Sequence, residues 1–377
     1  MTSLPLPAWR SPPAAARAAG TLCVLALAAG AADAQVTLGG TLDLATRHVR
    51  NGDLGSMNSV VSGANTTSKL VIRGREDLGG GLSAGFFLDG TILADSGAAN
   101  SPFWDRRATI GLTHQRYGEM RMGRDWVPTQ LVWNSMDPFA TLGIAGANTF
   151  RSVYGSRALG QAFGSNAAGA SQNPTLRVAN AVEYILPGGL GGFNGALIAT
   201  AGEGGSAGAG QTKGDGFRLG WAQGAWQLGA SQFTVRNAAA EERFTDRVWG
   251  VGYDAGFARF SLAQRRWAYG SDTTVNSLFG VSVPMGAGQL KLSVLRADQT
   301  GATDALSAND ATLLGVGYVY ALSKRTALYA HAARLSNQGG ASFAIAGGPA
   351  TSGVATAANY FGGQRSTGFE LGMRQDF

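Results

Sequence analysis

Apolar and polar residues alternate along much of this sequence, and no other feature constrains the fold as strongly. In residues 36–44 the valine and the leucines occupy even positions, whereas threonine and aspartate occupy odd ones. Similar alternation recurs at 69–75, 82–89, 107–112, 119–122 and 369–377. Because successive side chains of a strand point to opposite faces, this period predicts β-strands with one apolar and one polar face.

Composition narrows the class of protein that such strands can form. The chain has 377 residues, 45% hydrophobic and 14% charged, whereas about 25% of a typical soluble domain is charged. Abundant apolar residues argue against disorder, and no long apolar run beyond the first thirty-odd residues predicts a transmembrane helix. The basic residues form no run that would predict nucleic-acid binding. A secreted all-β protein and an outer-membrane barrel remain.

Residues 1–34 have the pattern of a secretory signal peptide. Arg10 and Arg17 precede a short apolar stretch, and a small-residue cleavage sequence ends at Ala34. We therefore predict cleavage after Ala34, with residues 35–377 forming a single exported domain. The only cysteine of the sequence lies within this leader, so no disulfide is expected in the mature chain.

Short turns and longer connections alternate between the predicted strands. The turns are predicted at 76–81, 114–118, 187–192, 223–224, 254–256, 284–288 and 322–326. The longer connections, rich in Gly, Ala, Ser and Asn, are predicted at 46–67, 91–103, 125–176, 201–215, 236–246, 267–275, 297–310 and 336–365. Transmembrane barrels alternate short and long connections in this way. Seven turns with the first and last strands predict an all-β fold, a sixteen-stranded antiparallel transmembrane barrel.

The connection at 125–176 is far longer than the others. A loop of this length in a compact domain usually has a function. We expect it to fold into the lumen of the barrel and to narrow it.

Five segments resemble a known family. Residues 68–84 read SKLVIRGREDLGGGLSA, residues 106–124 begin RRATIGL and end MRMGR, and the chain ends GMRQDF. With residues 35–44 and 318–337, these segments resemble the general porins of the Gram-negative outer membrane, in particular the anion-preferring beta-proteobacterial branch. Gly39 and Gln375 depart from the family pattern, which usually has an aromatic residue and a histidine there. The third loop matches poorly beyond residues 137–139.

The resemblance implies a homotrimer of sixteen-stranded barrels in the outer membrane, each a water-filled channel for small hydrophilic solutes. Its partners would be outer-membrane lipid, lipopolysaccharide and the small anions or solutes that pass. It also implies that the terminal Phe377 is part of a signal read by the outer-membrane assembly machinery.

The parity of the strands identifies candidate pore residues. It places Lys69, Arg73, Arg75, Arg107, Arg121 and Asp89 on the polar face. Arg47 shares this parity near a strand end, whereas Arg106 and Arg124 have the opposite parity. We expect Arg124 to turn inward, because an arginine facing lipid at the midplane costs about 2–4 kcal/mol. Asp137 in the long loop is the acidic residue expected opposite the arginines.

These arginines predict a channel that prefers anions. Clustered cations in a low-dielectric wall raise the local concentration of anions. The net charge of +6 becomes +5 once Arg10, Arg17 and Asp33 leave with the leader. A substrate-specific channel for phosphate or an organic acid is the alternative within this class.

Two other classes of function are more distant alternatives. An outer-membrane hydrolase needs a nucleophile beside a histidine, and a barrel would bring His48 and His331 together. No G-x-S-x-G motif stands at a predicted strand-to-helix turn to supply that nucleophile, since the two matches, at 81–85 and 204–208, lie at a predicted turn between strands and within a Gly- and Ala-rich connection. An adhesin would bind a partner through the Gly-, Ala- and Ser-rich loops at 201–215 and 336–365.

No cofactor or metal is predicted. The glycines at 79–81 do not open a helix, so they do not form a phosphate-binding loop. No Cys/His spacing indicates a zinc site, and the carboxylates do not follow a calcium-loop pattern.

Overall fold

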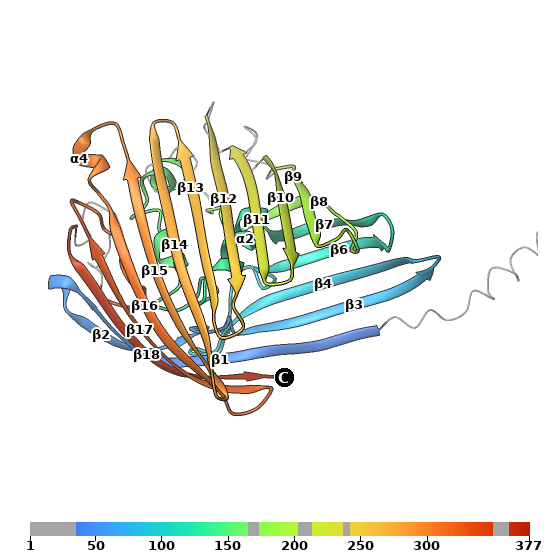
Figure 1. The fold of residues 1–377 in the computed structure, drawn as a ribbon, viewed down its shortest axis with the longest axis horizontal. Helices are drawn as coiled ribbons and strands as arrows, with labels where there is room; N and C mark the ends of the chain where they lie inside the picture. Colours follow the sequence, from blue (N-terminus) through green and yellow to red (C-terminus); the bar gives the residue numbers. More distant parts are fainter. Residues whose placement is uncertain (1–34, 165–172, 203–212, 237–241, 350–361) are drawn as a thin grey trace, which may run out of the picture.

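The computed structural model describes residues 35–164, 173–202, 213–236, 242–349 and 362–377. The predicted leader lies outside these residues. The described chain forms one continuous antiparallel sheet in which the first strand pairs with the last, so the barrel is closed (Figure 1). The predicted fold class is confirmed.

The strands account for most of the described chain. They are β1 (Gln35–Asn51), β2 (Ser56–Ser62), β3 (Lys69–Gly79), β4 (Leu82–Leu93), β5 (Ala98–Ala99), β6 (Arg107–His114), β7 (Gly118–Trp126), β8 (Arg177–Ile185), β9 (Phe193–Thr200), β10 (Gly214–Gln223), β11 (Trp226–Arg236), β12 (Arg243–Asp254), β13 (Arg259–Tyr269), β14 (Asp272–Met285), β15 (Gly288–Thr300), β16 (Ala311–Ala321), β17 (Thr326–Asn337) and β18 (Arg365–Asp376). The helical elements are η2 (Gly52–Leu54), α2 (Pro128–Met136), η3 (Ala147–Arg151), α3 (Arg157–Phe163) and α4 (Asp304–Ser307).

The segments β2 and β3 are two parts of one barrel strand. Both β2 and β3 pair with β1, β2 with residues 44–50 and β3 with residues 35–41. Between them the chain wraps around the buried carboxylate of Asp43, which accepts the backbone N–H groups of Ala64 at 3.1 Å and Thr66 at 2.8 Å. With β2 and β3 counted as one strand, and the short β5 set aside, the barrel has sixteen strands.

All seven predicted turns lie between consecutive strands, but two predicted long connections are wrong. The first, 46–67, is mostly strand, because β1 continues to Asn51 and pairs with β18 and β2. The second, 267–275, contains only a two-residue link between β13 and β14. Asp272 and Thr274 are strand residues that face inward, and Thr274 is fully buried.

The two faces of the wall differ in chemistry as the alternation predicts. The outer face exposes apolar side chains, for example Leu38, Leu197 and Leu219, each more than half exposed. The inner face carries polar groups such as Asp43 and Glu370, which are fully buried. An apolar outer face matches a surface in contact with lipid. Among the described residues, no helix is long and apolar enough to cross a membrane.

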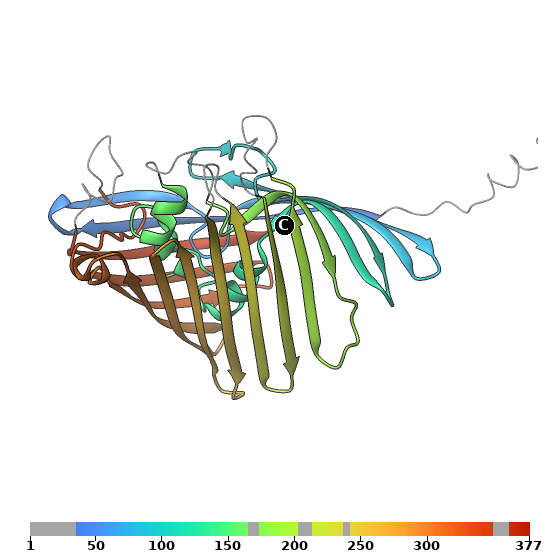
Figure 2. The ribbon, with the colours of Figure 1, turned by 90° about the horizontal axis from the view of Figure 1, so that it is seen from above.

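The described residues of the third loop, 127–164 and 173–176, pack against the inner face of the wall. Its buried apolar residues are Val132, Trp133, Met136, Phe139, Ile144 and Phe150. They form one core with inward-facing residues of the strands, among them Val248, Leu278, Leu295, Leu313 and Leu335. Helices α2 and α3 lie on the concave side of the sheet (Figures 1 and 2). These contacts are consistent with the predicted course of the loop.

A row of glycines on the inner face makes room for this loop. A methyl group added at Gly229 would come within 2.9 Å of Val132, and one at Gly280 within 2.6 Å of Pro138. Gly250, Gly315 and Gly317 approach Met136, Ala145 and Phe139 equally closely. We call Gly229, Gly250, Gly280, Gly315 and Gly317 the glycine row. Any larger side chain there displaces the loop.

Polar groups fasten the loop to the wall at two further places. Arg265 of β13, only 1% exposed, donates to Asp246 at 2.6 Å, to Gln130 of α2 at 2.6 Å and to the carbonyl of Thr175 at 2.7 Å. One buried side chain of the barrel wall, Arg265, thus holds both ends of the loop.

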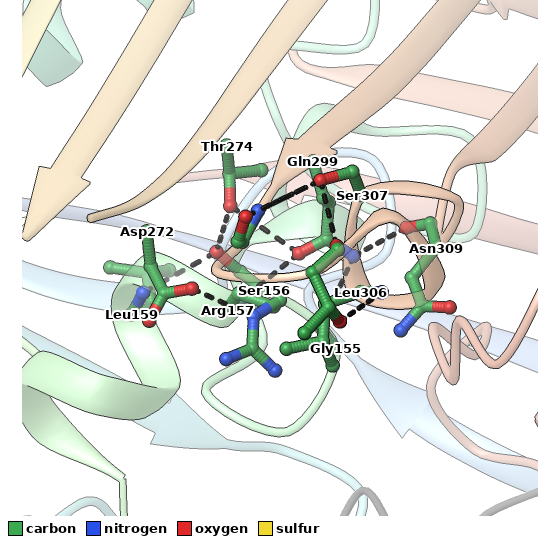
Figure 3. A network of polar contacts seen from close by, with 12 residues as sticks. Gly155, Ser156, Arg157, Leu159, Asp272, Thr274, Gln299, Leu306, Ser307 and Asn309 are labelled. Atoms are coloured by element: carbon green, nitrogen blue, oxygen red, sulfur yellow. Dashed lines mark hydrogen bonds and ion pairs between the residues drawn. The ribbon is translucent and has the colours of Figure 1, made fainter.

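The second fastening lies at the start of α3 (Figure 3). Arg157 Nε donates to Asp272 at 2.9 Å, and its backbone N–H donates to Gln299 Oε1 at 2.7 Å. The hydroxyls of Ser156 and Thr274 are hydrogen-bonded at 2.9 Å. These contacts join the helix to β14 and β15.

The glycine row leads to a prediction about the pore. Replacing Gly250 with valine should push Met136 and α2 off the wall, because a Cβ there would lie 2.6 Å from Met136 Cγ. Overpacking of this kind costs about 1–3 kcal/mol. We expect a lower single-channel conductance and a lower denaturation midpoint. The matched control is Gly252→Val, since a Cβ there comes no closer than 3.4 Å to any atom, the nearest being the flexible end of Arg259. Equal effects of the two substitutions would contradict the prediction.

Candidate functional site

Four of the predicted arginines lie on one stretch of the inner face. We call Arg73 and Arg75 of β3, Arg107 of β6 and Arg121 of β7 the arginine wall. The strand register aligns them. Arg73 lies opposite Phe87 of β4, and Phe87 lies opposite Thr109 of β6, which is on the same face as Arg107. Arg121 lies opposite Gly111 of β6, on the same face.

A cavity of about 650 Å³ opens onto this wall. Arg73, Arg75 and Arg107 line it together with Thr37 and Glu119. The side chains of Arg73 and Arg75 are exposed. Neither has an ion pair or a side-chain hydrogen bond with any residue that the structure describes. These two guanidinium groups therefore present their full charge to the cavity.

The other two arginines are held by three carboxylates. Arg121 pairs with Glu119 at 2.7 Å, with Asp125 at 3.0 Å and with Glu183 of β8 at 3.7 Å. Arg107 pairs with Asp125 at 3.2 Å. Three carboxylates thus hold the two guanidinium groups in place, and these two arginines add no net positive charge to the wall.

An aromatic ring positions Arg107. Its guanidinium lies over the ring of Phe87, 4.4 Å from the centroid, and its Nε donates to Thr109 Oγ1 at 3.1 Å. A cation over an aromatic face is attracted to it, and arginine stacks well because its guanidinium is planar. Phe87, which the sequence pattern did not single out, thus shapes the cavity.

The remaining predicted cations have different surroundings. Asp89 is buried and accepts Arg106 Nε through both oxygens, each at 3.1 Å. Arg106 precedes β6, so strand parity does not govern its direction. Lys69 lies at the start of β3, opposite Thr41 and Thr91 in the register.

Arg124 lies beside a bulge in β7. The register of β7 and β8 shifts between Gly123 and Asp125. Arg124 Nε donates to the carbonyl of Asp105, in the loop before β6, at 2.7 Å. Its described contact therefore ties that loop to the barrel rather than joining the arginine wall.

The expected role of Asp137 is wrong. Its carboxylate is buried and accepts the backbone N–H groups of Phe139 at 2.9 Å, Thr141 at 3.0 Å and Ala147 at 2.8 Å. Burial raises the pKa of Asp137, and the three amides partly oppose that rise. Asp137 shapes the turn of the third loop and does not face the arginine wall.

Parity reasoning missed several inner cations on the other strands. They are Arg218 of β10, Arg259 of β13, Lys291 of β15 and Arg374 of β18. Lys291 lies 5.9 Å from the ring of Phe139 of the third loop. The sequence could have indicated Lys291, because residues 289–293 read QLKLS, an alternation that places the lysine on the polar face between two leucines. Within the described chain, no group of three or more metal-ligating side chains is found.

The terminal Phe377 helps to close the barrel. Its backbone N–H and carbonyl pair with Gly40 of β1, both at 3.1 Å. Its ring lies over the same glycine, where an added methyl group would be 2.5 Å from the ring. The aromatic terminus and the glycine are therefore complementary.

Comparison with known proteins decides the family. A family model described as Gram-negative porin matches residues 21–340 of the chain. The chain is a Gram-negative porin. It is 36% identical over 377 residues to Outer membrane porin protein 32 of Delftia acidovorans, an alignment that covers 94% of this chain and 98% of the relative.

The porin is also similar to solved structures. The Anion-selective porin from Comamonas acidovorans matches with a TM-score of 0.75 and 30% identity, covering 92% of this chain and all of that one. The trimer form of OmpT of Vibrio cholerae matches with a TM-score of 0.60 at 14% identity, covering 91% and 99%. OmpF of Salmonella typhi has the same TM-score at 13% identity, covering 91% and 97%. These last two show the shared fold alone.

The family and the fold together give the function in outline. This porin is an outer-membrane protein that forms a channel for passive diffusion. The family resemblance read from the sequence segments is confirmed.

Proposed function

We propose that this porin conducts small hydrophilic solutes and prefers anions, and that the arginine wall sets this preference. The observation that carries the proposal is the exposure on the cavity of about 650 Å³ of two guanidinium groups, Arg73 and Arg75, that have no ion pair with any described residue. The similarity to the porin from Comamonas acidovorans, which is described as anion-selective, supports the proposal.

The charge balance of the wall explains why these two arginines matter most. Arg107 and Arg121 are offset by Glu119, Asp125 and Glu183, so they add no net positive charge. No carboxylate among the described residues pairs with Arg73 or Arg75. Fixed charges in a low-dielectric groove focus the field into the cavity and raise the local concentration of the opposite ion about tenfold or more.

The third loop supplies the opposite side of the proposed constriction. Its buried core contacts are with β1, β8, β9 and β11–β17, and the described core clusters contain no residue of β3, β6 or β7, the strands that carry the arginine wall. An ion would then pass between the loop and β3, β6 and β7. Porin membership and this open polar passage support a channel without a catalytic centre.

The ion preference is tested with the purified porin in a planar lipid bilayer. Under a potassium chloride gradient, the reversal potential should have the sign expected when chloride is more permeant than potassium, because the uncompensated charges are positive. Neutral sugars of increasing size, added to the bath, should reduce conductance until they no longer enter the channel. A reversal potential with the sign of potassium would contradict the proposal.

We further propose that the mature protein begins at Gln35, assembles as a homotrimer in lipid and lipopolysaccharide, and presents Phe377 to the outer-membrane assembly machinery. The signal-peptide pattern that ends at Ala34 supports the cleavage site, and the pairing of Phe377 with Gly40 at the closing strand supports the role of the aromatic terminus. Native mass spectrometry of the detergent-extracted protein should give three copies, each starting at Gln35. A monomer, or a chain that retains residues 1–34, would contradict the assembly or the cleavage site respectively.

A further inference from the structure

A second polar cavity lies far from the arginine wall. It has a volume of about 540 Å³ and is enclosed by β1, the third loop and the described part of the eighth loop, residues 338–349. Its lining includes two arginines, Arg47 and Arg151, with the hydroxyl groups of Ser62, Thr149 and Ser342. A cavity of this size can hold a small ligand with its first water shell.

The charges around the cavity are predominantly positive. No carboxylate lines it among the described residues. Arg47 Nη2 pairs with the buried Glu370 at 2.6 Å, and its Nη1 donates to the carbonyl of Ala346 at 3.2 Å. These two contacts fix the guanidinium in place at the edge of the cavity.

Arg151 is the uncompensated charge. Within the described chain its guanidinium has no hydrogen bond and no ion pair. Burial, together with the positive charge of Arg265, lowers the pKa of Arg151 to about 10, so it still carries its proton at neutral pH. A half-buried cation that no described carboxylate faces is costly, and an anion that enters the cavity relieves that cost.

The cavity is separate from the arginine wall. Arg73 and Arg75 pair with Thr37 and Gln35 at the start of β1, beside the short turns. Arg47 lies ten residues after Thr37 on the same strand, toward the long loops. At about 3.3 Å per residue, the two sites are roughly 33 Å apart along β1.

We propose that this cavity is a second anion site, on the long-loop side of the channel, that binds a small divalent oxyanion such as hydrogen phosphate. The charge of Arg151, which no described carboxylate offsets, attracts such an anion, and the planar forks of Arg151 and Arg47 with the surrounding hydroxyls donate to its several oxygens. A monovalent halide has fewer acceptor directions and half the charge. The site concentrates such anions before they reach the arginine wall, and this role rests on the proposed anion preference of the channel.

The test is inhibition of chloride current by inorganic phosphate. Phosphate is added on the long-loop side of the whole porin in a planar bilayer, and the half-inhibiting concentration is measured. In wild type the inhibition should saturate. Arg151→Gln should raise the half-inhibiting concentration about tenfold, as expected for losing charge-assisted hydrogen bonds to the anion. Arg151→Lys keeps the charge but loses the planar fork, so it should have an intermediate effect, and it serves as the folding control.

A matched variant in the wall separates the two sites. The double variant Arg73→Gln, Arg75→Gln should shift the reversal potential but leave the half-inhibiting concentration within about twofold of wild type. Two results would overturn the second site. One is that phosphate does not inhibit wild type in a saturable way, and the other is that wild type, Arg151→Gln and Arg151→Lys share the same half-inhibiting concentration. A cation-preferring wild type whose phosphate inhibition still depends on Arg151 would overturn the ion preference and leave the second site standing.

Discussion

Replacing Arg265 with methionine should lower the free energy of unfolding of the porin by about 3–5 kcal/mol. The substitution leaves the carboxylate of Asp246, which is fully buried, without its ion-pair partner. It also removes the hydrogen bonds to Gln130 and to the carbonyl of Thr175. Breaking a buried pair by removing one partner is costly because the remaining charge stays buried.

The same substitution should disturb the channel, because Arg265 holds the third loop at both ends. We expect a wider distribution of single-channel conductances and more current noise than in wild type. The measurement pairs bilayer recording with a guanidinium chloride titration followed by tryptophan fluorescence.

A matched surface variant and a double variant identify the cause. Arg296 pairs with Asp298 and Asp310, but its side chain is 59% exposed, so Arg296→Met should cost at most about 1 kcal/mol. Adding Asp246→Leu to Arg265→Met removes the stranded charge and should recover much of the stability. If Arg265→Met lowers the free energy of unfolding no more than Arg296→Met does, the buried pair does not hold the loop.

The double substitution Arg73→Gln, Arg75→Gln should reduce the chloride-to-potassium permeability ratio about tenfold. These are the two arginines of the wall whose charge no described carboxylate offsets. Once they are neutral, Glu119, Asp125 and Glu183 outnumber Arg107 and Arg121. The balance of the wall becomes negative, and cations gain access.

A charge-matched control separates local from overall charge. Lys324 and Arg325 lie exposed in the turn between β16 and β17, and their double substitution with glutamine removes the same net charge. Surface charges beyond a Debye length of about 10 Å are screened at 0.1 M salt. The control should therefore keep the permeability ratio of wild type within about twofold. An equal change in both double variants would assign the preference to net charge rather than to the wall.

Turn chemistry made most of the barrel predictable. The short turns contain glycines in the left-handed region, such as Gly79 with φ 79° and Gly224 with φ 57°, which few other residues adopt. The ends of strands with polar inward-facing residues were harder to predict, because Asp272 and Thr274 look like loop residues in the sequence but are buried in the wall. Polarity alone does not tell a loop from an inward face.

The site was predictable in its position but not in its charge. Parity places Arg73 and Arg75 correctly on the inner face, because it depends only on alternation. Whether an arginine is neutralised depends on neighbouring strands, and Glu183 reaches Arg121 only through the register of β7 and β8. Asp137 shows the limit in a loop, since no periodicity indicates which backbone amides a carboxylate will meet.

The glycine row has a consequence for the order of assembly. The third loop follows the first five barrel strands, but its packing surface is made from glycines 97 to 178 residues further along, from Gly229 opposite Val132 to Gly317 opposite Phe139. Contacts so distant in sequence form late, after the intervening chain has been ordered. The loop therefore cannot settle until the far strands have paired, so a nascent barrel remains wide until it is nearly complete.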